Sequence, residues 1–136
     1  MKVLFALDTL ANAGTEKSTL DIISHFTADV EVVVCCFFPG DDLKEAYEKA
    51  GIRLRYEPIR GRFPLLTGIR KLKQILVEEK PDVVVSSILR ANLMARIACK
   101  QTGIPLVGTF VSDSYSALRK SSFSLKRRLG FYYYYR

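Results

Sequence analysis

The sequence predicts an α/β fold, in which a doubly wound parallel sheet of about five strands carries helices on both faces. Three observations lead to this prediction. Short apolar runs of strand length recur along the 136 residues, and amphipathic segments of helical length separate them. Several of these runs are apolar throughout, which is typical of strands covered on both faces. Gly and Pro stand between the runs, so the chain fits a βαβ series with right-handed crossovers.

The first strand is expected at Val3–Leu7, where an apolar run ends at Asp8. A loop of small residues follows, Ala11–Gly14, and an amphipathic helix opens at Thr15. The inner side of this helix is expected to carry Leu20, Ile22 and Ile23. A strand, a glycine-containing loop and a helix N-terminus form the usual binding corner of an α/β protein, because backbone N–H groups and the helix dipole point into the crevice there.

This loop has two other interpretations. One is a plain strand-to-helix turn, since glycine is common in turns. The other is a phosphate-binding loop, since residues 11–18 loosely follow the pattern G-x-x-x-x-G-K-[ST]. The phosphate-binding pattern disagrees with the residues, because Ala11 replaces the first glycine and Glu16 stands where the second is required. A carboxylate at that place would repel a triphosphate, so the plain turn and the binding corner stay open.

The second strand is expected at Glu31–Phe38. The pair Asp41-Asp42 then offers an N-cap and first-turn negative charge to a short helix, and Gly51 is placed to end that helix. The third strand, residues 52–56, alternates apolar and basic residues, so it should be an edge strand with one wet face. An edge position for this strand gives the strand order 3-2-1-4-5.

The second half of the chain continues the alternation of helix and strand. The expected elements are a helix over Leu65–Glu79, a strand over Val83–Ser86, a helix over about 90–101 that stops before Gly103, and a strand over Ile104–Phe110. The apolar face of the first of these helices is formed by Leu65, Leu66, Ile69, Leu72, Ile75 and Leu76. In the predicted strand order, residues 8–17 and 86–92 face each other across a crevice between strands one and four, where ligands of such sheets bind.

The composition describes a globular domain. Hydrophobic residues make up 49% and charged residues 26%, the mean hydropathy is +0.08, and no apolar run approaches the roughly 20 residues of a membrane span. Asp8 interrupts the first apolar run too early for a signal peptide. Cys35, Cys36 and Cys99 lack the spacing of a zinc site, so they are expected as small buried hydrophobic residues in a reducing, cytoplasmic compartment. The single histidine, His25, is expected to face solvent or to cap the first helix.

Several short motifs, in the same order along the chain, resemble those of one known family. The opening strand with Ala13–Glu16 (AGTE), then Lys80–Ser86 (KPDVVVS), Ala91-Asn92 and Gly103–Thr109 (GIPLVGT) are similar to the N-terminal domain of family 4 glycosyltransferases of the GT-B fold. The resemblance covers nearly the whole chain. The chain departs from the family where Ala13 replaces the first glycine of a Gly-Gly-x-Glu motif, and where the family's histidines near strands four and five are absent.

The resemblance implies the Rossmann-like N-terminal half of a GT-B fold over residues 1–113, with 114–136 as a basic aromatic helical segment of the same domain. It implies that this half binds the acceptor, whereas a C-terminal domain beyond the chain binds the nucleotide-sugar donor. No cofactor is expected in this chain, and no metal, since no Asp-x-Asp motif is present. Carried over by position, the acceptor-binding residues are Gly14, Thr15, Glu16, Ser87, Arg90, Asn92, Thr109, Ser112 and Asp113. No catalytic base is assigned: Asp113 could act as one, but the N-cap of a helix over Ser114–Leu118 is its favoured role.

The net charge of +7 is concentrated in the C-terminal segment. From residue 114 onward there are six basic residues and no acidic ones, whereas the preceding part carries 15 basic and 14 acidic residues. Phenylalanine and tyrosine lie among these basic residues, and this composition suits contact with an anionic membrane surface. The expected membrane contacts are Arg119, Lys120, Phe123, Lys126, Arg127 and Arg128. Alternatively this segment packs on the remainder of a longer protein; nucleic-acid binding has no supporting motif.

The resemblance therefore implies the acceptor-binding part of a glycosyltransferase, inactive alone. The parent enzyme is expected to transfer a sugar from a nucleotide-sugar donor to a hydroxyl acceptor, either a glycan or a lipid-linked molecule, in the cytoplasm or at the inner face of a membrane. The family resemblance implies a hexosyltransferase of cell-envelope polysaccharide synthesis. The alternative is a non-catalytic Rossmann-like subunit that anchors a separate catalytic partner to a membrane.

Overall fold

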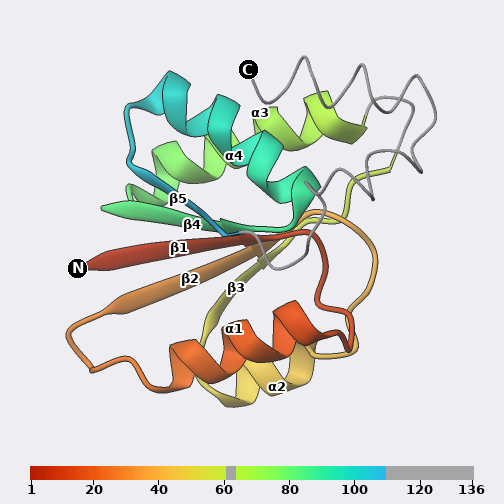
Figure 1. The fold of residues 1–136 in the computed structure, drawn as a ribbon, viewed down its shortest axis with the longest axis vertical. Helices are drawn as coiled ribbons and strands as arrows, with labels where there is room; N and C mark the ends of the chain where they lie inside the picture. Colours follow the sequence, from red (N-terminus) through yellow and green to blue (C-terminus); the bar gives the residue numbers. More distant parts are fainter. Residues whose placement is uncertain (61–63, 110–136) are drawn as a thin grey trace, which may run out of the picture.

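A five-stranded parallel sheet lies between two layers of helices in the computed structural model, which describes residues 1–60 and 64–109 (Figure 1). The strand order is β3-β2-β1-β4-β5, which confirms the predicted order. The strands are β1 (Lys2–Leu7), β2 (Glu31–Cys36), β3 (Arg53–Tyr56), β4 (Val83–Ser87) and β5 (Leu106–Thr109). The predicted end of the last strand at Phe110, and all later residues, lie outside the described part of the chain.

The helices divide between the two faces of the sheet. Two of them, α1 (Gly14–Ser24) and α2 (Lys44–Lys49), cover one face, and α3 (Pro64–Glu79) and α4 (Leu89–Thr102) cover the other (Figure 1). This division follows from right-handed crossovers. The chain steps in one direction across the sheet from β1 to β3 and in the opposite direction from β3 to β5, so the connecting helices fall on opposite faces.

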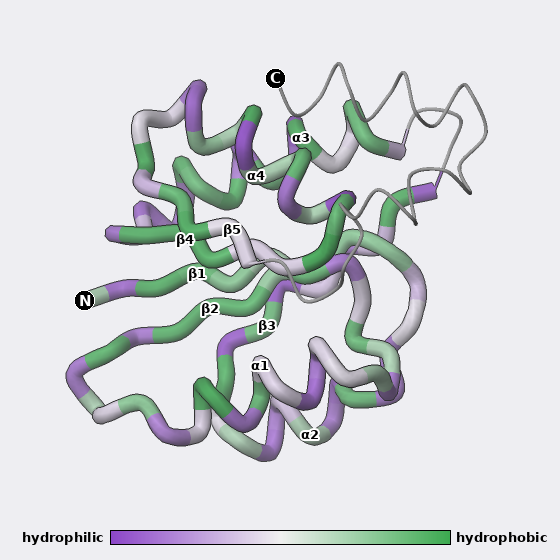
Figure 2. The backbone as a smooth tube through the Cα atoms, viewed as in Figure 1, coloured by the Kyte–Doolittle hydropathy of each residue, from purple (hydrophilic) through white to green (hydrophobic). Residues whose placement is uncertain are grey.

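Two apolar clusters form the core, one on each face of the sheet. Successive side chains of a strand point to opposite faces. In β1, Leu4 and Ala6 therefore join the cluster beneath α3 and α4, whereas Phe5 and Leu7 join the cluster beneath α1 and α2. Figure 2 shows the central strands as mostly hydrophobic, while hydrophilic and hydrophobic residues alternate along the helices. The apolar runs in the sequence are thus strands buried on both sides.

Helices α3 and α4 pack closely because a glycine lies at their contact. A Cβ atom added to Gly68 of α3 would collide with the Met94 sulfur of α4 and come within 3.2 Å of Ile59 Cδ1. Met94 is fully buried, so it has little room to move aside.

Both predicted glycine stops are confirmed. Gly51 has φ +72°, its N–H donates to Glu48 O at 3.0 Å, and the Ile52 N–H donates to Tyr47 O at 3.1 Å. These two bonds make a Schellman motif at the end of α2. Gly103 has φ +74° and its N–H donates to Cys99 O at 2.8 Å.

The prediction that Asp41 or Asp42 caps α2 is wrong. The helix begins at Lys44, its N-cap residue is Leu43, and no side chain caps it. The Lys44 N–H donates to Asp41 O in a turn that precedes the helix. The Asp42 carboxylate instead accepts a hydrogen bond from the Asn12 N–H at 3.1 Å, so it ties the loop after β2 to the loop after β1.

Three other details of the elements differ from the prediction. Strand β2 pairs only as far as Cys36, because the N–H groups of Phe37 and Phe38 both donate to Asp8 O. Ile22 is 52% exposed, since the buried residues of α1 are Glu16, Thr19 and Ile23. Leu66 is 56% exposed, because it lies on the flank of the buried stripe of α3.

The edge strand β3 is confirmed, but its polar face meets carboxylates of α3 rather than water alone. Arg55 pairs with Glu78 at 2.9 Å, and both Arg53 and Arg55 pair with Glu79 at 3.0 and 3.2 Å. Lys2 of β1 also pairs with Glu79, at 2.8 Å. This cluster of charges joins β1, β3 and α3 on one side of the sheet.

The cysteines and the histidine lie as expected. Cys35, Cys36 and Cys99 are free and buried. His25 is exposed at the C-cap of α1, and its Nδ1 lies 2.8 Å from Asp21 O. Within residues 1–60 and 64–109 no helix is long and apolar enough to cross a membrane. The same residues contain no group of three or more metal-binding side chains.

Candidate functional site

The carboxyl ends of β1 and β4 lie side by side at the point where the strand order reverses. These two strands pair in parallel, and the chain leaves them for α1 on one face and α4 on the other. Diverging connections of this kind open a crevice at the carboxyl edge of a parallel sheet, and ligands bind there. The two segments that the sequence predicted to face each other, residues 8–17 and 86–92, thus start at neighbouring strands, and Asp8 bonds to Arg90 and Ala91 between them.

Asp8, the residue after β1, holds the start of α4. Its side chain is buried; Oδ1 accepts a hydrogen bond from the Ala91 N–H at 2.8 Å, and Oδ2 accepts one from Arg90 Nε at 2.8 Å. The N-cap residue of α4, Ile88, makes no side-chain cap. Asp8 therefore caps α4 from the neighbouring strand. Burial raises the pKa of Asp8, although the hydrogen bond and charge of Arg90 and the Ala91 N–H act in the opposite direction.

The backbone between β4 and α4 is strained. Ile88 has φ +71° and ψ 157°, a conformation that costs free energy for a β-branched residue. The flanking hydrogen bonds fix it there, because the Asn92 N–H donates to Ile88 O at 2.9 Å and Asp8 holds the Ala91 N–H. The strained turn lets the helix begin within two residues of the strand.

Arg90 is fixed on two sides and still half exposed. Besides its contact with Asp8, its guanidinium carbon lies 3.8 Å from the ring centroid of Phe38, and the side chain is 52% exposed. Phe38 is buried just beyond the paired part of β2. Arg90 therefore lies against the carboxyl ends of β1 and β2.

A polar network joins β4, α4 and β5 next to this pair. Ser86 Oγ donates to Asn92 Oδ1 at 2.5 Å, and Asn92 Nδ2 donates to Thr109 O at 3.0 Å. Thr109 Oγ1 donates to Ser86 O at 3.1 Å and shares a 2.7 Å hydrogen bond with Ser87 Oγ. Ser86, Ser87 and Asn92 are buried. Much of the hydrogen-bonding capacity of these side chains is thus used inside the protein.

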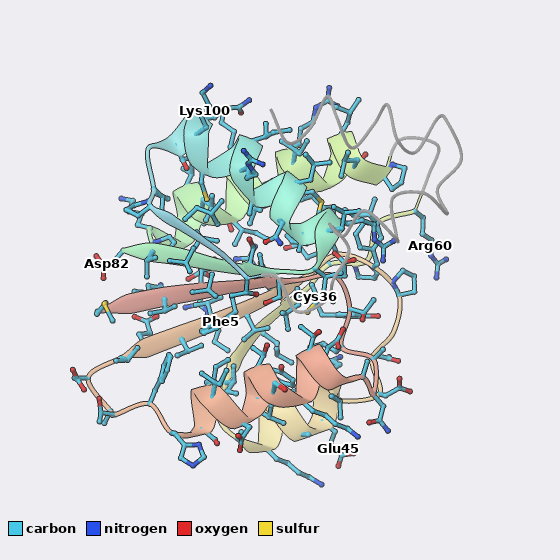
Figure 3. The ribbon with its side chains drawn as sticks, viewed as in Figure 1. Phe5, Cys36, Glu45, Arg60, Asp82 and Lys100 are labelled. Atoms are coloured by element: carbon cyan, nitrogen blue, oxygen red, sulfur yellow. The ribbon has the colours of Figure 1, made fainter. Side chains whose placement is uncertain are left out.

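Glu16, in the first turn of α1, points inward. It is 2% exposed; its Oε1 accepts a hydrogen bond from Thr9 Oγ1 at 2.9 Å, and Oε2 has no partner among the described residues. Its carbonyl oxygen accepts a hydrogen bond from Tyr47 Oη at 2.7 Å. Burial and the charges of Glu16 and Asp8 raise the pKa of Cys36, which lies at the end of β2 (Figure 3).

Gly14 and Thr15 form the exposed start of α1. A Cβ atom added to Gly14 would meet nothing within 4 Å, so the fold does not require glycine there. The Thr15 carbonyl accepts a hydrogen bond from Thr19 Oγ1 at 2.8 Å.

The predicted site residues fall into three groups. Ser87, Arg90, Asn92 and Thr109 gather around the start of α4, and Gly14, Thr15 and Glu16 belong to the start of α1. Ser112, Asp113 and the predicted membrane contacts lie outside the described residues. Asp8 and Ser86 lay in the two predicted segments but were not predicted as site residues, and Phe38 was missed altogether. A polar residue directly after an apolar strand was a signal for Asp8; no local pattern pointed to the ring of Phe38 beneath Arg90.

Comparison with known proteins identifies the family and the fold. The model of glycosyltransferase family 4 matches residues 12–136. No curated protein matches the chain. Among solved structures, HepE of Anabaena in complex with UDP is 21% identical with a TM-score of 0.67, and the match covers 89% of this chain and 33% of HepE.

Two further structures share this fold. The lipopolysaccharide outer core galactosyltransferase WaaB is 18% identical with a TM-score of 0.66, over 88% of this chain and 36% of WaaB. The UDP-GlcNAc 2-epimerase of Neisseria meningitidis is 18% identical with a TM-score of 0.63, over 86% and 35% of the two chains. The chain thus spans about a third of these proteins, and its fold is common to transferases and epimerases. The family match over residues 12–136 places the chain among the transferases: it belongs to glycosyltransferase family 4 and has the Rossmann-like architecture of its GT-B relatives.

Proposed function

We propose that this chain is the acceptor-binding part of a glycosyltransferase. The parent enzyme transfers a sugar, of hexose type, from a nucleotide-sugar donor to the hydroxyl group of a glycan or lipid-linked acceptor. The observation that carries the proposal is the contact between the carboxyl end of β1 and the start of α4, where Asp8 bonds to Arg90 and Ala91 and the family's motif positions in α4 bond to β5. The donor binds to a second domain beyond this chain, so the chain does not transfer sugar alone.

The contacts of each residue suggest how it contributes to acceptor binding. Gly14 leaves open space at the start of α1, where a ligand can approach the backbone. Arg90 is the half-exposed donor of the crevice. Ser87, Asn92 and Thr109 shape its wall, since they bond mainly to one another. Thr15 and Glu16 belong to the first turn of α1 beside Gly14, and Ser112 and Asp113 follow β5 in the sequence. The catalytic base is not assigned.

The relatives suggest where such an acceptor belongs. WaaB is described as a lipopolysaccharide outer core galactosyltransferase. We propose an acceptor of this cell-envelope class for this chain, reached in the cytoplasm or at the inner face of a membrane. None of the relatives reported above is a non-catalytic anchoring subunit, so that alternative gains no support.

The basic aromatic segment 114–136 supports a proposal of membrane contact. Its six basic residues have no acidic neighbours within the segment, and each gives roughly 1 kcal/mol near an anionic bilayer. Co-sedimentation with anionic and neutral vesicles at low and high salt is the test. Salt-sensitive binding to anionic vesicles alone is expected. Equal binding to anionic and neutral vesicles contradicts the proposal.

Acceptor binding is tested by NMR titration of the 136-residue chain with methyl glycosides of glucose, galactose and N-acetylglucosamine. We expect saturable binding of at least one glycoside, with shifts in residues of the crevice. Gly14→Ala should weaken it about tenfold, because the added methyl group occupies the space left for the ligand.

Gly103→Ala is the matched control for this titration. Gly103 lies at the far end of α4 with φ +74°, so its replacement lowers stability but leaves the affinity of the folded protein unchanged. Equal affinities of a bound glycoside in wild type and Gly14→Ala would contradict the proposed role of the crevice, and so would the absence of binding by both these neutral glycosides and their anionic counterparts.

A further inference from the structure

We propose that the acceptor carries an anionic group, a phosphate or a carboxylate, and that the terminal amino groups of Arg90 bind it. This inference rests on the proposed acceptor role of the crevice and adds the chemical class of the acceptor to it. Its basis is the way in which Asp8 and Phe38 hold Arg90.

Only one nitrogen of the Arg90 guanidinium is used by the described residues. Nε donates to Asp8 Oδ2 at 2.8 Å, whereas the amino groups Nη1 and Nη2 have no partner within residues 1–60 and 64–109. A guanidinium carries five N–H donors and no acceptor, so four donors remain for a ligand. Their fork geometry matches the paired oxygens of a carboxylate or a phosphate.

The orientation of these donors is set before a ligand arrives. Phe38 supports one face of the guanidinium at 3.8 Å, and Asp8 fixes Nε. Asp8 is held in turn, because its other oxygen accepts the Ala91 N–H at 2.8 Å. An arginine fixed in this way loses little side-chain entropy on binding, which favours affinity.

The direction of the Arg90 donors contributes more to anion binding than the net charge around them. Asp8 balances much of the charge of Arg90, and Glu16 adds a second buried carboxylate nearby, so net charge alone does not attract an anion. The attraction comes from the directed N–H donors and from the N-terminus of α4, whose dipole favours negative charge beside its first turn. A ligand with two paired oxygens gains most from such an arrangement.

The test is an NMR titration of the 136-residue chain that follows Arg90 Nε–H and the Ala91 amide. The probes are glucose 1-phosphate, methyl glucuronide, neutral methyl glucoside and UDP. We expect saturable binding of glucose 1-phosphate or methyl glucuronide with shifts at both groups, and at least tenfold weaker binding of methyl glucoside.

Substitutions at position 90 distinguish the contribution of the paired guanidinium donors from that of the positive charge. Arg90→Gln should weaken binding of the anionic sugars about tenfold or more, and Arg90→Lys should weaken it several-fold because lysine lacks the fork. Arg70→Gln, an exposed arginine of α3, is the matched control and should leave the affinity unchanged. Thermal unfolding of each variant verifies that it is folded.

The remaining outcomes distinguish this inference from the proposed function. Equal binding of methyl glucoside and the anionic sugars, unaffected by Arg90→Gln, overturns the inference and leaves the acceptor site intact. Binding of UDP alone, dependent on Arg90, also overturns it, because the anion would then belong to the donor. Arg90-dependent binding of both anionic sugars with no methyl glycoside bound supports the inference while narrowing the acceptor to charged sugars.

Discussion

Glu79 is a carboxylate held by three cations. Its side chain is 3% exposed, and Lys2, Arg53 and Arg55 lie 2.8, 3.0 and 3.2 Å from its oxygens. Burial alone would raise the pKa of Glu79, but the hydrogen bond and charge of Lys2, the charge of Arg53 and the hydrogen bond of Arg55 outweigh it and lower that pKa. The carboxylate therefore stays charged in the folded protein.

Glu79→Gln is predicted to lower the free energy of unfolding at pH 7 by about 1–3 kcal/mol, because it leaves three cations without their shared partner. The expected loss is below that for a fully buried pair, since Arg53 is 59% exposed. Wild-type stability should also fall as the pH drops below the ordinary glutamate pKa of 4.5, because a group with a lowered folded pKa loses its contribution there. Urea unfolding between pH 3 and pH 7 measures both effects.

Glu78→Gln is the control for this substitution. Glu78 is 42% exposed and pairs with Arg55 alone among the three cations, so its removal should matter much less. Equal losses in the two variants, or a pH dependence that persists unchanged in Glu79→Gln, would show that Glu79 is not the group that governs acid stability.

At the scale of elements, the end of α2 could be predicted and its beginning could not. The end depends on Gly51, whose conformation is a local property. The beginning depends on Asp42, which bonds to Asn12 in a loop 30 residues earlier in the sequence. The same holds for β2, whose last apolar residues, Phe37 and Phe38, donate to the Asp8 carbonyl instead of extending the ladder. Local patterns therefore placed the elements, while contacts between loops set their bounds.

Gly51→Ala is predicted to cost roughly 1–2 kcal/mol of stability. Nothing lies within 4 Å of the added Cβ, so the cost arises from the backbone alone, which must keep φ at +72°. Gly14→Ala provides the comparison, since Gly14 has equal space but no positive φ and should lose no stability. Thermal unfolding of the two variants measures the difference, and equal melting temperatures would contradict the assigned strain.

At the scale of the whole molecule, the sequence predicted which two segments meet but not which side chains pair. Five apolar runs and the crossover rule were enough to place β1 beside β4, from which residues 8–17 and 86–92 continue. The pairing of Asp8 with Arg90 joins residues 82 positions apart, and it depends on the register of β1 against β4, in which Ala6 lies beside Ser86. The residue pattern of either segment alone does not predict how β1 and β4 align.

Asp8→Ala is predicted to open the first turn of α4 without unfolding the rest of the helix. The Ala91 amide loses its acceptor, so its hydrogen exchange should accelerate strongly, whereas the Gly103 amide at the other end of α4 should keep its protection. Native-state hydrogen exchange followed by NMR measures both amides. Equal acceleration at the two ends would mean that the substitution destabilises the whole domain rather than one cap.

The cap that Asp8 supplies also dictates an order of assembly. A helix usually receives its N-cap from the residue before it, so it can form as soon as that stretch is synthesised. Here Asp8 emerges from the ribosome 83 residues before its partner Ala91, and the pairing of β4 with β1 is what places the two side by side. The polar groups of the crevice are therefore completed late in folding, after the sheet that supports them. A nascent chain that ends before α4 has strands β1 to β4 of this fold but lacks α4 and β5, and so lacks the polar groups of the site.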